Sequence, residues 1–271
     1  MPAVKHLVEL CATFELEGEY QLLFPWADGG SLKNLWKSLP TSLFGFTADI
    51  ESNVFMHWLA TQACGLMSGL STIHELPQPR PNEVADNKLY GIHGDLKPEN
   101  ILHFSQETEE HSFGRLKIAD FGIVEFRSLA TRTSPNQEYT GPASPTYRSP
   151  EHDIGIQQKR SRKVDIWSMG CVFSELLTWA RHGGDAVESY RECRLAEPTR
   201  LGESSGWKED NFFCRAKGIV YGERGSRRQY DRHIVKPSVD KVSLARSSSS
   251  IQPCLDCTTL IVLEVSGIAD S

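Results

Sequence analysis

The pattern of apolar and polar residues near the start of the chain predicts a β-hairpin. Two short apolar runs lie between Lys5 and Phe24, and the charged segment Glu15–Glu19, which contains one glycine, separates them. A charged segment with a glycine between two apolar runs is typical of a hairpin turn. The next segment, Pro25–Gly30, is rich in turn-forming residues, so it is predicted to connect two structural units.

Later segments carry the patterns of helices and strands. In Asp49–His74 large apolar residues recur at steps of three, four and seven, which predicts one face of a long helix. Val164–Trp179 is apolar on nearly all sides, which favours a buried helix. Between these helices, Asn100–Phe104 and Leu116–Asp120 have the pattern of short strands, and the polar segment Ser105–Arg115 is predicted to be the loop that joins them.

The pattern weakens beyond Arg181. No long amphipathic helix is evident there, the stretch Gly222–Arg232 is basic with two glycines, and Ser247–Ser250 is a run of serines. From about Lys241 the chain is expected to be loose or disordered, because a segment of this composition buries little apolar surface.

The composition is that of an ordinary globular protein. The 271 residues are 39% hydrophobic and 24% charged, which excludes disorder throughout the chain. The formal charge is −6, from 29 Lys and Arg against 35 Asp and Glu, and there is no basic stripe, so nucleic acid is not an expected partner. Seven scattered cysteines, an odd number, favour a reduced intracellular protein. No apolar signal segment and no span long enough for a bilayer is evident, so we expect a soluble protein without a membrane partner.

The densest cluster of potential chemistry lies in the sequence His93-Gly94-Asp95-Leu96-Lys97-Pro98-Glu99-Asn100. A loop with this spacing can present a proton acceptor, Asp95, a cation, Lys97, and a metal-binding amide, Asn100, to one point. Twenty residues after Asn100, Asp120 stands at the end of a predicted strand. Carboxylate and amide oxygens suit Mg²⁺ that is shared with substrate phosphates. Together with a Lys and an Asp base, Mg²⁺ can transfer a phosphoryl group to a hydroxyl.

In this order and spacing, the motifs resemble those of the eukaryotic-type Ser/Thr protein kinases. Asp95–Asn100 matches the catalytic loop of that family, Asp120-Phe121-Gly122 its metal-binding triplet, Ser149-Pro150-Glu151 its Ala-Pro-Glu signature, and Asp165–Gly170 the start of its buried helix. The likeness covers about residues 5–185 and continues patchily to about 238. The wider pattern around Leu22–Gly30 resembles kinases common in fungal proteomes. The resemblance implies an α+β kinase-like fold, with a mostly helical C-lobe and only a remnant of the β-rich N-lobe.

The resemblance also implies a role for each matched residue. Asp95 would orient the substrate hydroxyl and accept its proton, and Lys97, which resembles the Ser/Thr branch, would neutralise charge on the transferred group. Asn100 and Asp120 would hold Mg²⁺. The expected ATP site consists of Phe24 behind the adenine, Ala27 through its backbone, Leu102 beneath the ring, and Lys97 with Asp120. The matched residues with structural roles are His93, Phe121, Gly122, Ser144, Glu151 and Asp165, of which His93 is expected to be buried and hydrogen-bonded.

Several features depart from the family pattern. Kinases carry a Gly-rich loop, a strand Lys and a helix Glu before the predicted hairpin, whereas this chain begins close to it. The chain is therefore expected to be truncated, with weak or no activity. Gly94 replaces the Arg that usually precedes the catalytic Asp, so activity is not expected to depend on phosphorylation of the activation segment. The stretch Gly218–Lys236 only faintly resembles a Gly-rich loop with its Lys, because the glycine spacing and the order along the chain differ, so an ordinary basic loop is favoured.

The sequence thus predicts a remnant of a kinase N-lobe and hinge at 1–30, a kinase C-lobe at 31–238 that diverges after about 185, and a disordered tail at 239–271. The leading hypothesis is a protein serine/threonine kinase that uses ATP and Mg²⁺ and acts on protein substrates. One alternative is a pseudokinase-like binding or scaffold module without catalysis. Another is a nonfunctional product, in which the divergent tail is misread coding sequence and the chain does not fold stably.

Overall fold

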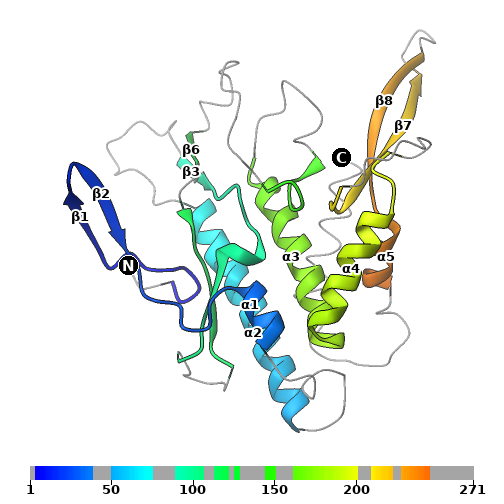
Figure 1. Ribbon diagram of the computed structural model, residues 1–271. Helices are drawn as coiled ribbons and strands as arrows, with labels where there is room; N and C mark the ends of the chain where they lie inside the picture. Colours follow the sequence, from blue (N-terminus) through cyan, green and yellow to red (C-terminus); the bar gives the residue numbers. More distant parts are fainter. Residues whose placement is uncertain are drawn as a thin grey trace. The chain divides into compact units, whose positions relative to one another are not determined.

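The computed structural model describes residues 4–38, 50–75, 89–106, 113–121, 125–128, 144–150, 161–200, 209–221 and 227–244 (Figure 1). The chain forms two compact units, Met1–Ser134 and Pro135–Ser271. Both combine helices with two-stranded antiparallel sheets, so the predicted α+β class is confirmed. No helix within the described ranges is long and apolar enough to cross a bilayer.

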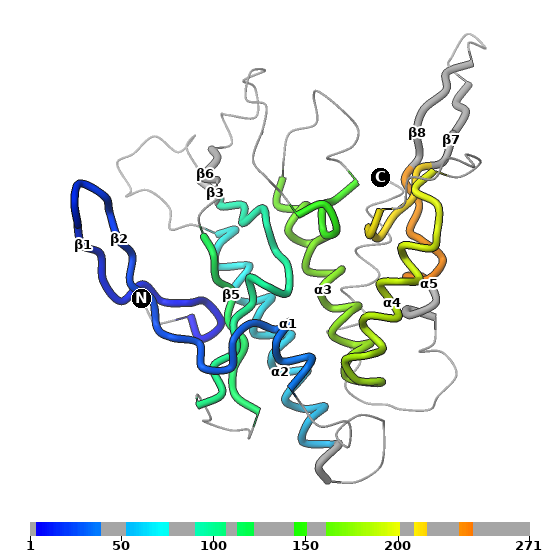
Figure 2. The backbone as a smooth tube through the Cα atoms, viewed as in Figure 1, coloured from blue at the N-terminus to red at the C-terminus, as the bar shows by residue number. Residues whose placement is uncertain are grey.

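The first unit begins with the predicted hairpin, formed by β1 (Ala12–Leu16) and β2 (Glu19–Leu23). Its antiparallel register leaves a two-residue turn. Both turn residues have a positive φ, 54° at Glu17 and 83° at Gly18, as a type I′ turn requires. Glycine adopts this conformation without strain, which explains its place in the charged segment. The hairpin stands apart from the helices of the same unit (Figure 2).

The core of the first unit lies on α2 (Ile50–His74), which confirms the predicted long helix. Trp58 of this helix is fully buried, and its indole Nε1 donates a hydrogen bond to the Gly114 carbonyl at 2.6 Å. The side-chain Oε1 of Gln62 accepts the backbone N–H of Leu116 at 2.9 Å. A polar side chain therefore ties the helix to the strand that leads to Asp120.

The other elements of the first unit are short. They are α1 (Leu32–Ser38), β3 (Leu89–Ile92) paired with β6 (Glu125–Ser128), the single turn η2 (Pro98–Asn100), and β4 (Ile101–Phe104) paired with β5 (Arg115–Ile118). The pair β4–β5 confirms the two strands predicted in this region. The backbone of residues 6–8 lies along β5, where the Val8 N–H donates to the Ile118 carbonyl and the Ile118 N–H to the His6 carbonyl, each at 2.9 Å.

The second unit contains the predicted buried helix, α3 (Lys163–His182). The elements that follow it are α4 (Gly184–Ala196), β7 (Phe213–Tyr221) paired with β8 (Arg227–Val235), and α5 (Pro237–Leu244). These elements form beyond Arg181, where the sequence pattern weakens, and β8 lies inside the stretch Gly218–Lys236, for which an ordinary basic loop was favoured.

Long-range packing explains why these later elements escaped the sequence pattern. Their core is a cluster of buried residues from α3, from α4, and from the first residue of β7 and the residue before it, namely Trp167, Cys171, Tyr190, Phe212 and Phe213. Val235 and Val239 pack against this cluster, so the end of β8 and the helix α5 are attached to α3. Helix α5 covers the first residues of the expected disordered tail, and residues 245–271 lie outside the described part of the chain.

Candidate active site

The loop after β3 is held in place by a buried histidine. His93 is fully buried, its Nδ1 accepts the backbone N–H of Asp95 at 3.3 Å, and its Nε2 lies 3.0 Å from the Ala119 carbonyl. One neutral tautomer, with the proton on Nε2, satisfies both contacts. His93 is therefore buried and hydrogen-bonded, and its ring ties this loop to the residue just after β5.

Two polar side chains of this loop, Lys97 and Asn100, meet at the carboxylate of Asp95. Lys97 Nζ donates to Asp95 Oδ2 at 2.6 Å, and Asn100 Nδ2 donates to the same oxygen at 3.3 Å and to the Asp95 backbone carbonyl at 2.8 Å. The exposed fractions of the Asp95 and Lys97 side chains are 10% and 25%, so both are sheltered but still reach solvent. A charge-assisted contact with a lysine is short and strong, so it holds the carboxylate in a fixed orientation. The structure therefore brings together the acceptor, cation and amide that the sequence placed in one loop.

Asp120 lies two residues beyond the end of β5 and is exposed. The Ala119 N–H donates to the Asn100 carbonyl at 2.9 Å, so the residue before Asp120 is bonded to the backbone of the catalytic loop. Asp120 has a φ of 65°, in the left-handed region that few residues other than glycine, asparagine and aspartate adopt. The next ring, Phe121, is half-buried, with its centroid 5.9 Å from that of His93.

The donor set of this region fits a magnesium ion. The hydrogen bonds of Asn100 to Asp95 use its amide nitrogen, which leaves the amide oxygen for a ligand role. Asp120 adds a carboxylate. Mg²⁺ in phosphoryl-transfer sites is held by one or two protein oxygens plus phosphates and waters, so two such residues suffice. Consistent with this sparse set, the described residues contain no group of three or more His, Cys, Asp or Glu that could hold a metal by themselves.

The turn-rich connector after β2 is fastened to the end of β4. The Gly29 N–H donates to the His103 carbonyl at 3.0 Å, and the His103 N–H donates to the Gly30 carbonyl at 2.7 Å. A side chain at Gly29 would overlap the His103 ring, so the close approach requires glycine there. Ser105 donates from its N–H and its hydroxyl to the Asp28 carboxylate, and these hydrogen bonds lower the pKa of Asp28.

Two of the three residues expected to surround the adenine meet at one apolar cluster. Ala27 and Leu102 both pack against the buried residues Val8, Phe104 and Ala119. The Ala27 carbonyl accepts the Gly30 N–H at 3.1 Å, which gives the connector a fixed backbone path. Phe24 is 40% exposed and lies outside this cluster.

The remaining predicted residues belong to the second unit or cannot be placed. Asp165 is almost fully buried in the first turn of α3, and Ser144 is half-buried. Gly122 and Glu151 lie outside the described residues. The roles expected for Asp165 and Ser144 in relation to the catalytic loop therefore stay predictions.

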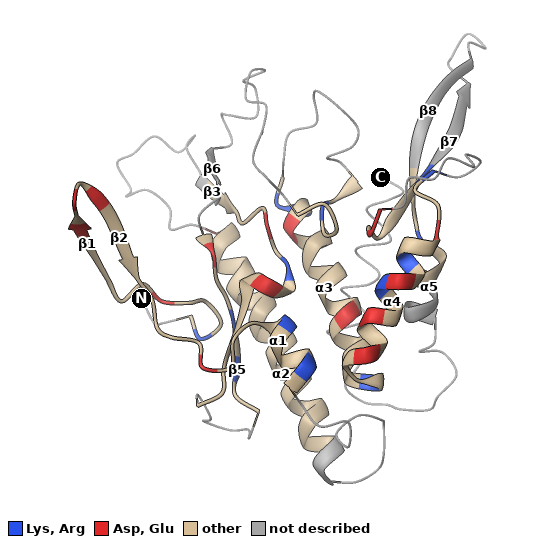
Figure 3. Ribbon diagram, in the orientation of Figure 1, with Lys and Arg blue, Asp and Glu red and all other residues tan. Residues whose placement is uncertain are grey.

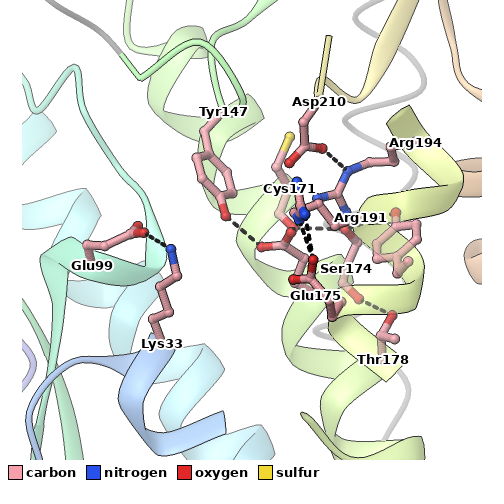
Figure 4. A network of polar contacts seen from close by, with 12 residues as sticks. Lys33, Glu99, Tyr147, Cys171, Ser174, Glu175, Thr178, Arg191, Arg194 and Asp210 are labelled. Atoms are coloured by element: carbon pink, nitrogen blue, oxygen red, sulfur yellow. Dashed lines mark hydrogen bonds and ion pairs between the residues drawn. The ribbon is translucent and has the colours of Figure 1, made fainter. Parts of the chain in front are cut away.

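Sequence reasoning missed an ion pair beside the catalytic loop. Lys33 Nζ of α1 lies 2.7 Å from Glu99 Oε1, and both side chains are exposed (Figure 4). The two residues are 66 positions apart, and no local pattern connects them. The pair links α1 to the turn that carries Asn100.

Sequence reasoning also missed a buried polar network in the second unit. The guanidinium of Arg194 on α4 donates to Glu175 Oε1 of α3 at 2.7 Å and to Asp210 Oδ1 at 2.8 Å (Figure 4). The Tyr147 hydroxyl donates to the other oxygen of Glu175 at 2.8 Å. The segment that contains Tyr147 is thereby tied to α3, and α3 to α4.

The network is buried, and aromatic rings lie against its guanidinium. The Arg194 guanidinium carbon lies 4.5 Å from the Tyr190 ring centroid and 4.2 Å from that of Phe212, and such contacts favour a cation. Burial raises the pKa of Glu175 more than the Arg194 charge lowers it. Burial by itself lowers the pKa of Arg194, but the carboxylates of Glu175 and Asp210 raise that pKa by more than burial lowers it, so the guanidinium stays charged.

Comparisons with known proteins agree with this geometry. The family model described as the protein kinase domain matches residues 2–189. The dual specificity tyrosine-phosphorylation-regulated kinase 3 of Homo sapiens is 36% identical over 140 residues, which is 49% of this chain and 20% of that protein. The cyclin-dependent kinase-like 4 of Homo sapiens is 44% identical over 88 residues, or 32% of this chain and 20% of that protein. The homeodomain-interacting protein kinase 1 of Caenorhabditis elegans is 35% identical over 132 residues, or 46% of this chain and 14% of that protein. The chain thus spans about a fifth or less of these relatives.

Proposed function

Since this chain belongs to the protein kinase family, we propose that it transfers the γ-phosphoryl group of ATP to serine or threonine hydroxyls of protein substrates. The observation that carries the proposal is the cluster in which Lys97 and Asn100 both donate to Asp95 Oδ2. This cluster holds a carboxylate, a cation and an amide at one partly sheltered point. Kinases among its relatives, named as dual-specificity and cyclin-dependent kinases, support the same reaction class.

Each residue of the cluster has a chemical task in the proposed reaction. The Asp95 carboxylate orients the substrate hydroxyl and takes its proton as the oxygen forms a bond to the γ-phosphorus and the bond to the leaving oxygen of ADP breaks. Lys97 offsets negative charge on the transferred group, and its contact with Asp95 keeps both side chains in place. His93 does not touch the reacting atoms and acts by fixing the loop.

The proposed nucleotide site uses residues that follow β2, residues in or just before β4, and Asp120 beyond the end of β5. Ala27 and Leu102, which share an apolar cluster, would border the adenine, with Phe24 behind it. Asn100 and Asp120 would hold Mg²⁺ between them and the phosphates. When bound, the ion would supply charge neutralisation on the phosphate oxygens.

The organisation and cellular setting are proposals of the same kind. Residues 1–30 would contribute the N-lobe and hinge portion and residues 31–238 the C-lobe portion of the kinase domain. Action inside the cell is supported by the number and spacing of the cysteines, since the seven are scattered and odd in number, whereas a secreted disulfide framework usually has an even number.

The proposal is tested by measuring phosphate transfer from γ-labelled ATP to casein with Mg²⁺, using the full chain and two variants. Asp95→Asn removes the proton acceptor and should lower transfer by about 10³-fold. Asp185→Asn makes the same chemical change at an exposed position in the first turn of α4 and should leave transfer unchanged. ATP affinity, measured by calorimetry, should be similar in all three proteins.

Two results would overturn the proposed activity. One is transfer by Asp95→Asn at the rate of the unchanged chain, since Asp95 would then have no part in the reaction. The other is ATP binding without any Asp95-dependent transfer, which would instead establish the alternative of a pseudokinase-like binding module.

A further inference from the structure

The ribbon formed by β7 and β8 carries a charge opposite to that of the rest of the chain. Its two strands contain five Lys or Arg residues and one Asp. They contribute +4 to a formal total of −6, so the remaining residues carry −10. Helix α4, by contrast, has acidic and basic residues along its length (Figure 3). A segment of one sign on a chain of the other sign favours a partner of opposite charge.

The base of the ribbon is fixed to the second unit. Phe213, at the start of β7, is buried, and Val235, at the end of β8, packs against the same cluster. The Arg215 N–H donates to the Thr199 carbonyl at 2.8 Å, so a further segment holds β7. A fixed base reduces the conformational entropy that a binding partner has to remove. The ribbon also follows residue 189, where the match to the kinase domain model ends, so the kinase motifs do not explain its charge.

The register divides the residues of the ribbon between two faces. Because successive residues of a strand alternate between faces, Arg228, Tyr230 and Arg232 of β8 share one face. The single acidic residue of the two strands, Asp231, lies on the other face, opposite Lys217. The β7 residues opposite the first three are small or apolar, namely Val220, Gly218 and Ala216. The face with Arg228 and Arg232 therefore has two cations and no acidic residue from either strand.

The spacing on this face matches an extended peptide. Ile234 is the next residue of the face toward the base and is 37% exposed, and we call Arg228, Tyr230, Arg232 and Ile234 the cationic face. The backbone positions of its two arginines are about 13 Å apart, since a strand rises about 3.3 Å per residue. Acidic residues four positions apart in an extended partner have the same separation. Gly218 stands midway on the opposite strand, and a glycine inside a strand often marks the close approach of another backbone.

The charge of the remaining chain favours a short acidic peptide over nucleic acid. A nucleic acid carries a phosphate at every nucleotide, so it would be repelled by the net negative charge outside the ribbon. A short peptide with two carboxylates needs only the cations of the ribbon. Arginine and tyrosine are also enriched at the centres of interfaces between proteins.

We propose that the cationic face is a docking site for an extended acidic segment of a partner protein, with Asp or Glu at two positions four apart and an apolar residue midway. Arg228 and Arg232 would form charge-assisted hydrogen bonds with the two carboxylates. The apolar residue would contact Tyr230. The site includes none of the residues assigned to phosphoryl transfer, so its failure and the failure of that activity are distinguishable.

The test uses the full chain and a fluorescein-labelled peptide with the sequence Thr-Glu-Thr-Leu-Thr-Glu-Thr. Fluorescence anisotropy should show saturable binding that weakens as NaCl is added. Replacing both glutamates by glutamine should weaken binding at least about tenfold. A peptide of the same composition with adjacent glutamates should bind several-fold more weakly, because neighbouring residues of an extended segment face opposite sides.

Matched variants separate the cationic face from general attraction. Arg228→Gln and Arg232→Gln should each weaken binding several-fold, whereas Arg227→Gln makes the same change on the other face and should have little effect. Tyr230→Thr should also weaken binding, whereas Tyr221→Thr, on the other face, should not. The comparison of peptides on the unchanged chain keeps the test valid if a variant loses the ribbon.

Four outcomes would overturn the inference. The first is the absence of saturable binding of the acidic peptide, and the second is equal binding of its glutamine counterpart. The third is a loss of binding in Arg227→Gln as large as that in Arg228→Gln. The fourth is a single-stranded oligonucleotide that binds more tightly than the peptide and depends on Arg232, which would make nucleic acid the occupant.

Discussion

Replacing Arg194 by methionine should strongly destabilise the second unit. The change keeps an unbranched apolar stem but removes the guanidinium that donates to Glu175 at 2.7 Å and to Asp210 at 2.8 Å. Arg194 is fully buried, and the side chain of Glu175 is only 4% exposed, so solvent cannot replace the lost partner of that carboxylate. Breaking a buried ion pair by removing one member typically costs about 3–5 kcal/mol.

This loss of stability can be measured as a fall in the melting temperature. For a unit of this length, each kcal/mol shifts the melting temperature by about 2–4 °C. Arg194→Met should therefore lower the melting transition of the second unit by about 6–20 °C in calorimetry of the full chain. Leu195→Met, at a half-buried position on the same helix, is the matched control and should shift it little.

A second change isolates the carboxylate. In the double variant Arg194→Met with Glu175→Gln, no charge is left unpaired between α3 and α4. The double variant should therefore recover about 1–3 kcal/mol relative to Arg194→Met alone, measured as a double-mutant cycle by urea unfolding.

The pH dependence of the stability of Arg194→Met supplies an independent check on the buried ion pair. Burial raises the pKa of Glu175 and the Arg194 charge opposes this rise, so removing Arg194 raises that pKa further. The folded state then takes up a proton at a higher pH than the unfolded state, and the penalty is relieved as the pH falls below the folded pKa. The deficit of Arg194→Met should therefore shrink between pH 8 and pH 5. A deficit below about 1 kcal/mol that is the same at both pH values would refute the buried ion pair.

Two further predictions concern the first unit. Burial lowers the pKa of His6 despite its contact with the Leu116 carbonyl, so as the pH falls the unfolded state takes up a proton before the folded state does, and the free energy of unfolding should decrease below about pH 6.5. In urea unfolding, His6→Gln should lose less stability between pH 8 and pH 5.5 than the unchanged chain, and an equal loss would contradict the prediction. Lys33→Ala breaks the exposed ion pair with Glu99 and should lower the free energy of unfolding by no more than about 1 kcal/mol at low salt, and by less in 1 M NaCl. A larger loss in urea unfolding that does not depend on salt would show that the pair is not simply a surface contact.

Local chemistry explains what could be predicted from the sequence. The periodicity of Asp49–His74 and the apolar run Val164–Trp179 indicated α2 and α3, and the glycine in Glu15–Glu19 indicated the hairpin turn. The meeting of Asp95 and Asn100 could also be expected from the sequence, because the two residues are five positions apart in one loop and are hydrogen-bonded to each other. Such features depend on spacing within a single element, which the sequence displays directly.

Contacts between distant residues could not be predicted in this way. The ring of His93 reaches the Ala119 carbonyl 26 residues later, and the Lys33–Glu99 pair joins positions 66 apart. Beyond Arg181 the sequence lacks a clear period, yet α4, the β7–β8 hairpin and α5 follow, because their apolar residues are buried against α3 rather than along one regular face.

The sequence by itself determined the helices with strong periodicity, the hairpin turn and the residue types of the catalytic loop, since these follow from short-range backbone preferences and local spacing. Only the tertiary structure decided that Ala27 and Leu102 share one apolar cluster and that the guanidinium of Arg194 is buried between Glu175 and Asp210. The physical reason is that burial and charge pairing depend on which segments meet in space. An isolated arginine on a weakly amphipathic stretch gives no sign of the carboxylates it will contact.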